Sequence, residues 1–318
     1  MIYNKIGKLL FPIAFIMLLS LYSCIIASHI SQRGEVNAKQ DAGEVITKQD
    51  AMVNFAVDFS ACPAQATLPC TAIIASDAFK IDPTKLMAGK ELTAEAWVKI
   101  HSTSTTGAIF GRMDSAGIYL LVESGKPKVV VRRAVKPTGT VDLIVSSPYS
   151  LLLDTWTHLA GVLSFPSAAT STLSLYVDGQ SVANVGAEVA STLYTEPGTT
   201  YMRAGAYAEG DDITGVPKSS ALDGVVDEAR LWGVARTQSE IQACMGEELG
   251  LNSGTCGRMT DDLIGYFRFN QGSGHSVREW SGLGWGVVDY MDKNSSKNPP
   301  VEMWDTGWTA GAPISVTD

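Results

Sequence analysis

A carboxylate placed among apolar side chains is the feature of this sequence that most directly suggests chemistry. The dipeptide Asp223-Gly224 is a turn signal, and the residues after it are typical of a β-strand, whose successive side chains point to opposite faces. This alternation places Asp227 on the same face as Val225 and Ala229. Because a buried carboxylate must accept hydrogen bonds or bind a metal ion, the sequence predicts one of these two roles for Asp227.

Short strands bounded by turn residues recur along the middle of the chain. Leu92–Ile100 alternates cleanly between two faces, and Leu173–Ala183 forms a hairpin that turns at an Asp-Gly dipeptide. Strands at such spacing are typical of a β-sandwich. Farther along, Thr237 and Glu240 form a capping box, and apolar residues follow at helical spacing, which predicts one short helix near 237–249.

Four motifs follow one another in the order of a known fold family. They are E-A-W-V at Glu95–Val98, W-x-H-x-A at Trp156–Ala160, L-x-L-Y-V-D-G at Leu173–Gly179 and L-x-x-Y-x-R-F at Leu263–Phe269. With Ala221–Trp232, they closely resemble the LamG-like jellyroll domains of the concanavalin A-like lectin/glucanase group. The resemblance covers Ala56–Trp308 and implies an all-β, concanavalin A-like jellyroll sandwich. Since no internal repeat is present, residues 51–318 are expected to form one domain.

The same resemblance implies one structural Ca²⁺, which concanavalin A-like domains often bind through Asp side chains and backbone carbonyls. Calcium requires several oxygen ligands. Asp227 is the best candidate, and Asp58, in the Asp-Phe element of the family, is the second. The alternative is that Asp227 accepts N–H hydrogen bonds from a neighbouring loop and binds no metal.

Glycoside hydrolases of the same fold place their carboxylates along one strand as E-x-D-x-x-E, so that alternate acids face one groove. Glu209 and Asp211 begin this pattern, but Thr214 stands where its last Glu would be. The sequence also lacks the G-x-S-x-G and H-E-x-x-H motifs. It therefore favours a non-catalytic protein. The alternative is a glycan-processing enzyme with a non-standard site.

Charged residues in the strands matched to the family share faces with aromatic residues. Glu228 and Arg230 are two residues apart in one strand, so each can neutralise the other. His158 lies in a core strand and is expected to be a packed histidine rather than a base. We expect a buried or half-buried charge network among Glu95, Glu228, Arg230 and Arg268.

The loop Tyr207–Ser220 is the predicted contact surface for a ligand, which we expect to be a glycan or an extracellular or matrix protein. Tyr207, Asp211 and Asp212 supply the ring and the charges that such a contact requires. Other tyrosines near loops offer free rings, whereas the tryptophans in family motifs are expected in the core. These tyrosines are Tyr149, Tyr194 and Tyr201, and these tryptophans are Trp97, Trp156 and Trp232.

Four cysteines lie downstream of the N-terminal segment, and an even count in an exported protein implies disulfides. The sequence allows three disulfide pairings of these four cysteines. The simplest pairs Cys62 with Cys70 and Cys244 with Cys256, because each pair brackets a short polar loop. A metal site is disfavoured, since no C-x-x-C spacing occurs.

The N-terminus has the pattern of an export signal. Two lysines precede the apolar run Leu9–Leu21, which ends in Leu21-Tyr22-Ser23-Cys24. This ending resembles a bacterial lipobox and implies a signal peptide over 1–23, lipidation of Cys24 and a flexible tether over 24–50. The resemblance favours the outer membrane or cell surface, with the lipid as the only membrane attachment. The alternative is a secreted or periplasmic protein.

The formal net charge of −9 argues against nucleic acid as a partner. Phosphate binding requires concentrated Lys and Arg, and this chain has no basic cluster.

Overall fold

The computed structural model describes residues 54–60, 73–75, 91–113, 117–134, 140–167, 170–188, 203–205, 222–250, 256, 262–272, 276–278, 280, 287–290 and 308–315. The chain divides into two units, Met1–Gln49 and Asp50–Asp318, and all of these residues belong to the second. Within them, no helix is long and apolar enough to cross a membrane.

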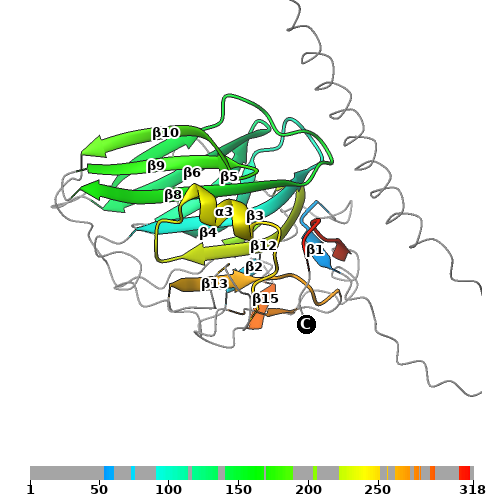
Figure 1. The fold of residues 1–318 in the computed structure, drawn as a ribbon. Coiled ribbons are helices and arrows are strands. Elements are labelled where there is room, and N and C mark those ends of the chain that lie inside the picture. The colour runs from blue at the N-terminus through cyan, green and yellow to red at the C-terminus, as the bar shows by residue number, and fades with distance from the viewer. Residues whose placement is uncertain are drawn as a thin grey trace, which may run out of the picture. The chain divides into compact units, whose positions relative to one another are not determined.

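Two antiparallel sheets form the unit that the structure describes (Figure 1). The first sheet has the order β10 (Gln180–Glu188), β9 (Thr170–Val177), β8 (Thr157–Ser167), β3 (Leu92–Ile100), β12 (Gly224–Trp232), β1 (Phe55–Asp58), β16 (Trp308–Ala310), and β13 (Leu263–Phe267) also pairs with β12. The second sheet has the order β14 (Ser276–Arg278), β15 (Val287–Tyr290), β2 (Ile73–Ala75), β11 (Arg203–Ala204), β4 (Gly107–Met113), β5 (Gly117–Glu123), β6 (Lys126–Ala134), β7 (Thr140–Ser146). The predicted all-β sandwich is confirmed.

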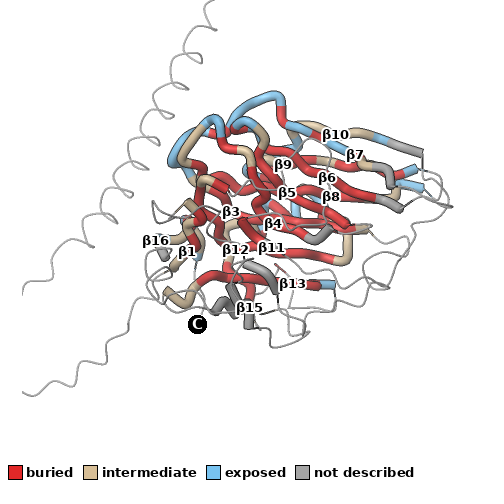
Figure 2. The backbone as a smooth tube through the Cα atoms, turned by 180° about the vertical axis from the view of Figure 1, so that it is seen from behind, coloured by how far each residue is buried: buried red, intermediate tan, exposed pale blue. Residues whose placement is uncertain are grey.

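The main hydrophobic core lies between the two sheets, and the buried stretches follow the strands of both (Figure 2). Alternate residues of β3 contribute to it, as the pattern of Leu92–Ile100 predicts. The second sheet contributes alternate residues in the same way, including Leu120 and Val129, and β13 adds Phe267. The inner face of β3 is therefore the one that its alternation in the sequence predicts.

The strand β12 departs from the predicted alternation at one point. Its pairing with β3 shifts between Asp227, which is opposite Trp97, and Arg230, which is opposite Glu95. Glu228 lies inside this β-bulge with φ of 49°. The extra residue reverses the faces downstream, so that Ala229 joins the main core instead of sharing a face with Asp227.

The predicted helix is present as α3 (Gln238–Cys244), which ends earlier than the expected range 237–249. Thr237 is its N-cap, and its capping box with Glu240 is formed as predicted. Ile241 packs against Ala160 of β8, so α3 covers the face of the first sheet that points away from the main core. We call this the outer face of the first sheet.

The two sheets approach each other closely at Gly161, so a substitution there tests the fold directly. A Cβ atom at this residue would come within 2.4 Å of the Cγ2 atom of Val129. We expect Gly161→Ala to lower the free energy of unfolding by about 1–3 kcal/mol, because overpacking forces neighbouring side chains apart. Urea denaturation measures the change. The matched control is Gly186→Ala in β10, where the nearest atom is 4.0 Å away; equal effects of the two substitutions would contradict the packing.

Candidate functional site

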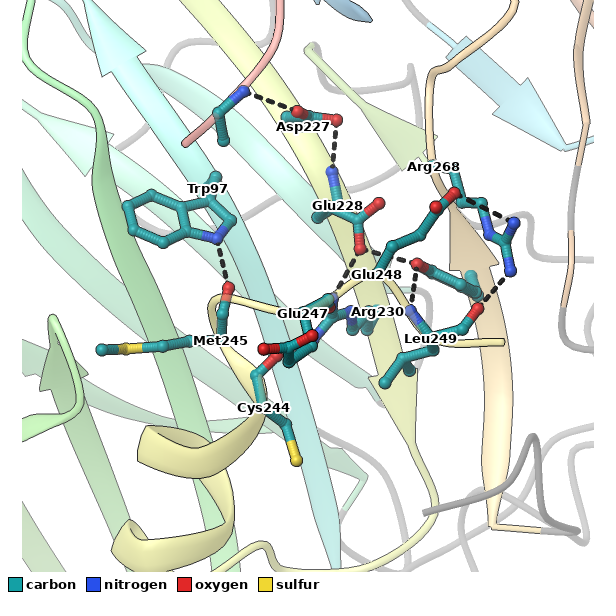
Figure 3. A network of polar contacts seen from close by, with 12 residues as sticks. Trp97, Asp227, Glu228, Arg230, Cys244, Met245, Glu247, Glu248, Leu249 and Arg268 are labelled. Carbon is teal, nitrogen blue, oxygen red and sulfur yellow. Dashed lines mark hydrogen bonds and ion pairs between the residues drawn. The ribbon is translucent and has the colours of Figure 1, made fainter. Parts of the chain in front are cut away.

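Asp227 accepts hydrogen bonds from three N–H donors, of which Figure 3 labels Glu228. These are the side-chain amide of Asn54 at 3.0 Å and the backbone amides of Glu228 and Ala312, each at 2.8 Å. Burial and the nearby charge of Glu228 raise the pKa of Asp227 well above its usual value, although the three donors oppose the shift. The structure therefore shows the hydrogen-bonding role predicted for Asp227.

Among the described residues, Asp58 and Asp227 have no hydrogen-bond partner in common. Asp58 accepts hydrogen bonds from the amide and hydroxyl of Ser60, at 2.9 and 2.5 Å, and lies 3.6 Å from Nε2 of His101. In the described part of the chain, no group of three or more His, Cys, Asp or Glu side chains is arranged to hold a metal ion. The N–H groups around Asp227 present partial positive charge where a cation would bind, which favours the metal-free alternative; calcium stays a prediction.

Arg230 is the centre of a buried charge network on the outer face of the first sheet. Its guanidinium lies 2.5 Å from a carboxylate oxygen of Glu228 and 3.6 Å from one of Glu95. All three side chains are about 1% exposed. Burial alone would lower the pKa of Arg230, but the adjacent carboxylates raise it above its usual value, so the arginine stays charged. The predicted burial of these three residues is confirmed.

The two carboxylates beside Arg230 differ in their surroundings. Glu228 accepts a hydrogen bond from the hydroxyl of Tyr266 at 2.6 Å, and its pKa is raised because burial outweighs the attraction of Arg230. Glu95 accepts a hydrogen bond from the indole of Trp232 at 2.9 Å. Burial acts to raise the pKa of Glu95, but the positive charge of Arg230 and the other neighbouring groups lower it overall. Glu95 is therefore the more stable anion of the pair.

His158 completes this network from β8. Its Nε2 lies 3.8 Å from Glu95, and its ring packs edge-on against Trp97 with 5.4 Å between the centroids. Burial lowers the pKa of His158 to about 4, so the ring is neutral at physiological pH. This agrees with its expected role as a packed histidine.

Arg268 is also buried, but its carboxylate partner was not predicted. It pairs with Glu248 at 2.9 Å, and its guanidinium lies 4.1 Å from the ring centroid of Trp280. Glu248 follows α3 in the sequence and is 2% exposed. Sequence reasoning missed Glu248 because two adjacent glutamates after a surface helix are typical of a solvated turn.

The network fastens the segment 238–250 to the outer face of the first sheet (Figure 3). Arg230 donates to the carbonyls of Cys244 and Glu247, and the indole of Trp97 donates to that of Met245 at 2.6 Å. The amide of Leu249 donates to the hydroxyl of Tyr266 at 2.9 Å. These contacts are buried or part-buried, and together they hold the segment 238–250 against the sheet.

The two cysteines near α3 are free thiols in the structure. Cys244 and Cys256 are both buried, and the Cys256 thiol donates to the carbonyl of Ala243 at 3.3 Å. Burial and the adjacent Cys256 thiol raise the pKa of Cys244 to about 12. The predicted disulfide is thus not formed here, although the two side chains interact. Its formation stays a prediction, and Cys62 and Cys70 lie outside the described residues.

The predicted contact residues Tyr207, Asp211 and Asp212 lie outside the described residues, as do Tyr194, Tyr201 and Cys24. The residues flanking the predicted loop are described, however. The amide of Leu222 donates to the carbonyl of Gly205 at 2.8 Å. The described residues on the two sides of the predicted loop are therefore in direct contact.

Two of the three tryptophans in the family motifs lie in the core as expected. Trp97 and Trp232 are buried, as predicted. Trp156 is only half-buried, and the ammonium of Lys99 lies 5.0 Å from its ring centroid. Trp156 is therefore a partly exposed ring rather than a core residue.

The family of the chain follows from this fold and its motifs. A model of the concanavalin A-like lectin/glucanases superfamily, Laminin_G_3, matches residues 75–242. The chain belongs to this superfamily, which confirms the resemblance seen in the sequence. No curated protein matches the chain.

Several solved structures are similar in fold. A candidate carbohydrate-binding protein from Bacteroides ovatus ATCC 8483 is 15% identical with a TM-score of 0.47, and the match covers 79% of this chain and 62% of that protein. The CBM40 of the Ruminococcus gnavus IT-sialidase, bound to α2,3-sialyllactose, is 11% identical with a TM-score of 0.41, over 55% and 94% of the two chains. Domains LG4-5 of the mouse laminin α1 chain are 13% identical with a TM-score of 0.40, over 64% and 47%. At these identities the likeness concerns the fold alone.

Breaking the buried pair tests the network. We expect Glu228→Gln to lower the free energy of unfolding by about 3–5 kcal/mol, because Arg230 would keep a buried charge without its nearest counter-ion. The control is Asp154→Asn, which removes the partner of His101 from a pair whose side chains are 69% and 29% exposed and should cost less than about 1 kcal/mol. Thermal and urea unfolding measure both. A Glu228→Gln effect no larger than the control would show that the charges are effectively solvated.

The pH dependence of stability tests His158. Because its pKa falls from 6.5 to about 4 on folding, the unfolded chain takes up a proton at a pH where the folded chain does not. Stability is therefore full above pH 6.5 and decreases as the pH falls toward 4, by roughly 3 kcal/mol for this residue. We expect wild type to lose about this much more stability than His158→Gln between pH 7 and 4, measured by urea denaturation. Parallel profiles for the two proteins would contradict the shift.

Proposed function

We propose that this protein is a non-catalytic binding module that recognises a glycan or an extracellular protein. The observation that carries the proposal is that the buried carboxylates are bound to partners within the protein. Glu95, Glu228 and Glu248 pair with arginines, and Asp227 accepts backbone and amide N–H groups. These acids hold the scaffold together, which leaves recognition to the loops.

The contact surface that we propose is the loop Tyr207–Ser220, with Tyr207, Asp211 and Asp212 as the ligand-binding residues. Its support is the hydrogen bond between Leu222 and Gly205, which joins the described residues on the two sides of this segment. Loops whose ends lie together on a rigid scaffold are often functional.

We further propose that the protein is exported and attached to the outer membrane or cell surface through a lipid on Cys24. The support is the sequence pattern alone, namely the signal segment 1–23 and the lipobox-like ending. The polar segment 24–50 would then act as a tether. A structural Ca²⁺, if bound, would stabilise the sandwich rather than contact the ligand.

A glycan and matrix-protein array tests the proposed function. The protein used is Ser28–Asp318, which retains the whole of the compact unit Asp50–Asp318. We expect binding to a restricted set of probes and no hydrolysis of any glycan, with parallel arrays in calcium and in chelator. Alanine at Tyr207, Asp211 and Asp212 together should abolish binding, because the ring and both charges are removed.

The control for the array is Tyr149→Ala, which removes an exposed ring from a different loop and should keep the binding. Hydrolysis of an arrayed glycan would falsify the non-catalytic proposal. Binding that survives the triple substitution would place the contact surface on another loop.

A further inference from the structure

One loop exposes several large apolar side chains. Of the four large hydrophobic residues that are exposed in the described part of the chain, three lie in Ser147–Thr155, which we call the 147–155 loop. Tyr149 is 75% exposed, Leu152 70% and Leu153 45%. Clustered apolar residues on a surface mark sites of interaction, whereas single ones need no explanation.

The 147–155 loop is fixed to the sandwich at several points. Leu151 is buried in the main core between the exposed residues. The amide of Leu151 donates to the carbonyl of Gly125 at 2.8 Å, and the amide of Asp154 donates to that of Ile100 at 2.9 Å. The apolar side chains therefore project from a backbone held at both ends, and their exposure is a property of the fold.

Several polar backbone atoms next to these side chains are hydrogen-bonded within the protein. The hydroxyl of Ser147 accepts from the amide of Tyr149 at 3.0 Å and donates to its carbonyl at 2.9 Å. The hydroxyl of Thr155 donates to the carbonyl of Leu153 at 3.0 Å. Such internal pairing removes much of the cost of moving a loop out of water into an apolar phase.

We propose that the 147–155 loop docks on a lipid bilayer, with Tyr149, Leu152 and Leu153 entering the interface between headgroups and acyl chains. Three side chains expose on the order of a few hundred Å², well below the roughly 800 Å² per partner of a stable protein interface. A bilayer accepts so small a surface because it needs no complementary shape. Tyrosine is enriched at the headgroup level, and leucine partitions toward the acyl chains.

The charges around the loop favour a zwitterionic bilayer surface over an anionic one. Asp154 is 69% exposed and lies 2.6 Å from Nδ1 of His101, and Asp58 lies on the other side of the same ring. Lys126 is exposed at the neighbouring turn, but the whole chain carries a net charge of −9. An anionic bilayer would repel such a protein, so phosphatidylcholine is the preferred lipid.

Vesicle flotation tests the proposal with the protein Ser28–Asp318, which lacks the apolar N-terminal run. The probe is a vesicle of phosphatidylcholine alone, compared with one containing phosphatidylglycerol. We expect measurable partition of the wild type into the phosphatidylcholine vesicle and less into the anionic one. The double substitution Leu152→Ser with Leu153→Ser should lower the partition coefficient by about tenfold or more, because two buried aliphatic groups are lost.

The matched control is Ile144→Ser in β7, an aliphatic side chain that is 38% exposed outside the 147–155 loop. It should change the partition coefficient by less than about twofold, and urea denaturation should show that all variants fold. No partition of the wild type, equal partition of the double variant, or binding to anionic vesicles alone would each overturn the proposal. So would a dimer that the double substitution dissociates, since the loop would then serve a second copy of the chain. Failure of the glycan array affects none of these outcomes.

Discussion

Burial of the Arg230 charge is the constraint on which the outer face of the first sheet depends. A guanidinium that is 1% exposed is tolerated only if carboxylates and carbonyls surround it. Glu228 and Glu95 supply the carboxylates, and the chain after α3 supplies the carbonyls of Cys244 and Glu247. The segment 238–250 must therefore pack against the sheet for the charge to be stable, which links the helix to β12.

The β-bulge in β12 makes this arrangement geometrically possible. In a regular strand Glu228 and Asp227 would point to opposite faces, and one of them would enter the apolar core. The bulge lets Ala229 fill the core position, while Asp227 reaches Asn54 and Ala312 and Glu228 reaches Arg230. The cost is a glutamate with φ of 49°, which the surrounding hydrogen bonds offset.

Asp223, which follows the predicted contact loop in the sequence, and the 147–155 loop both contact the end of β3. The carbonyl of Asp223, after the predicted contact loop, accepts from the amide of His101 at 3.1 Å. The carbonyl of Ile100 accepts from Asp154 of the 147–155 loop at 2.9 Å. The charge network and α3 thus stabilise the sheet to which both Asp223 and Asp154 are hydrogen-bonded near the end of β3.

The sequence by itself determined the sandwich, the family, the helix with its cap and the burial of Arg230, because each rests on local spacing or on motifs in their order along the chain. It could not predict the bulge at Glu228, because an extra residue in one strand is defined only by its pairing with another. It also missed Glu248 as the partner of Arg268 and the exposure of Leu152 and Leu153. Those features depend on which segments meet in space, and only the packing of the chain onto both sheets decided them.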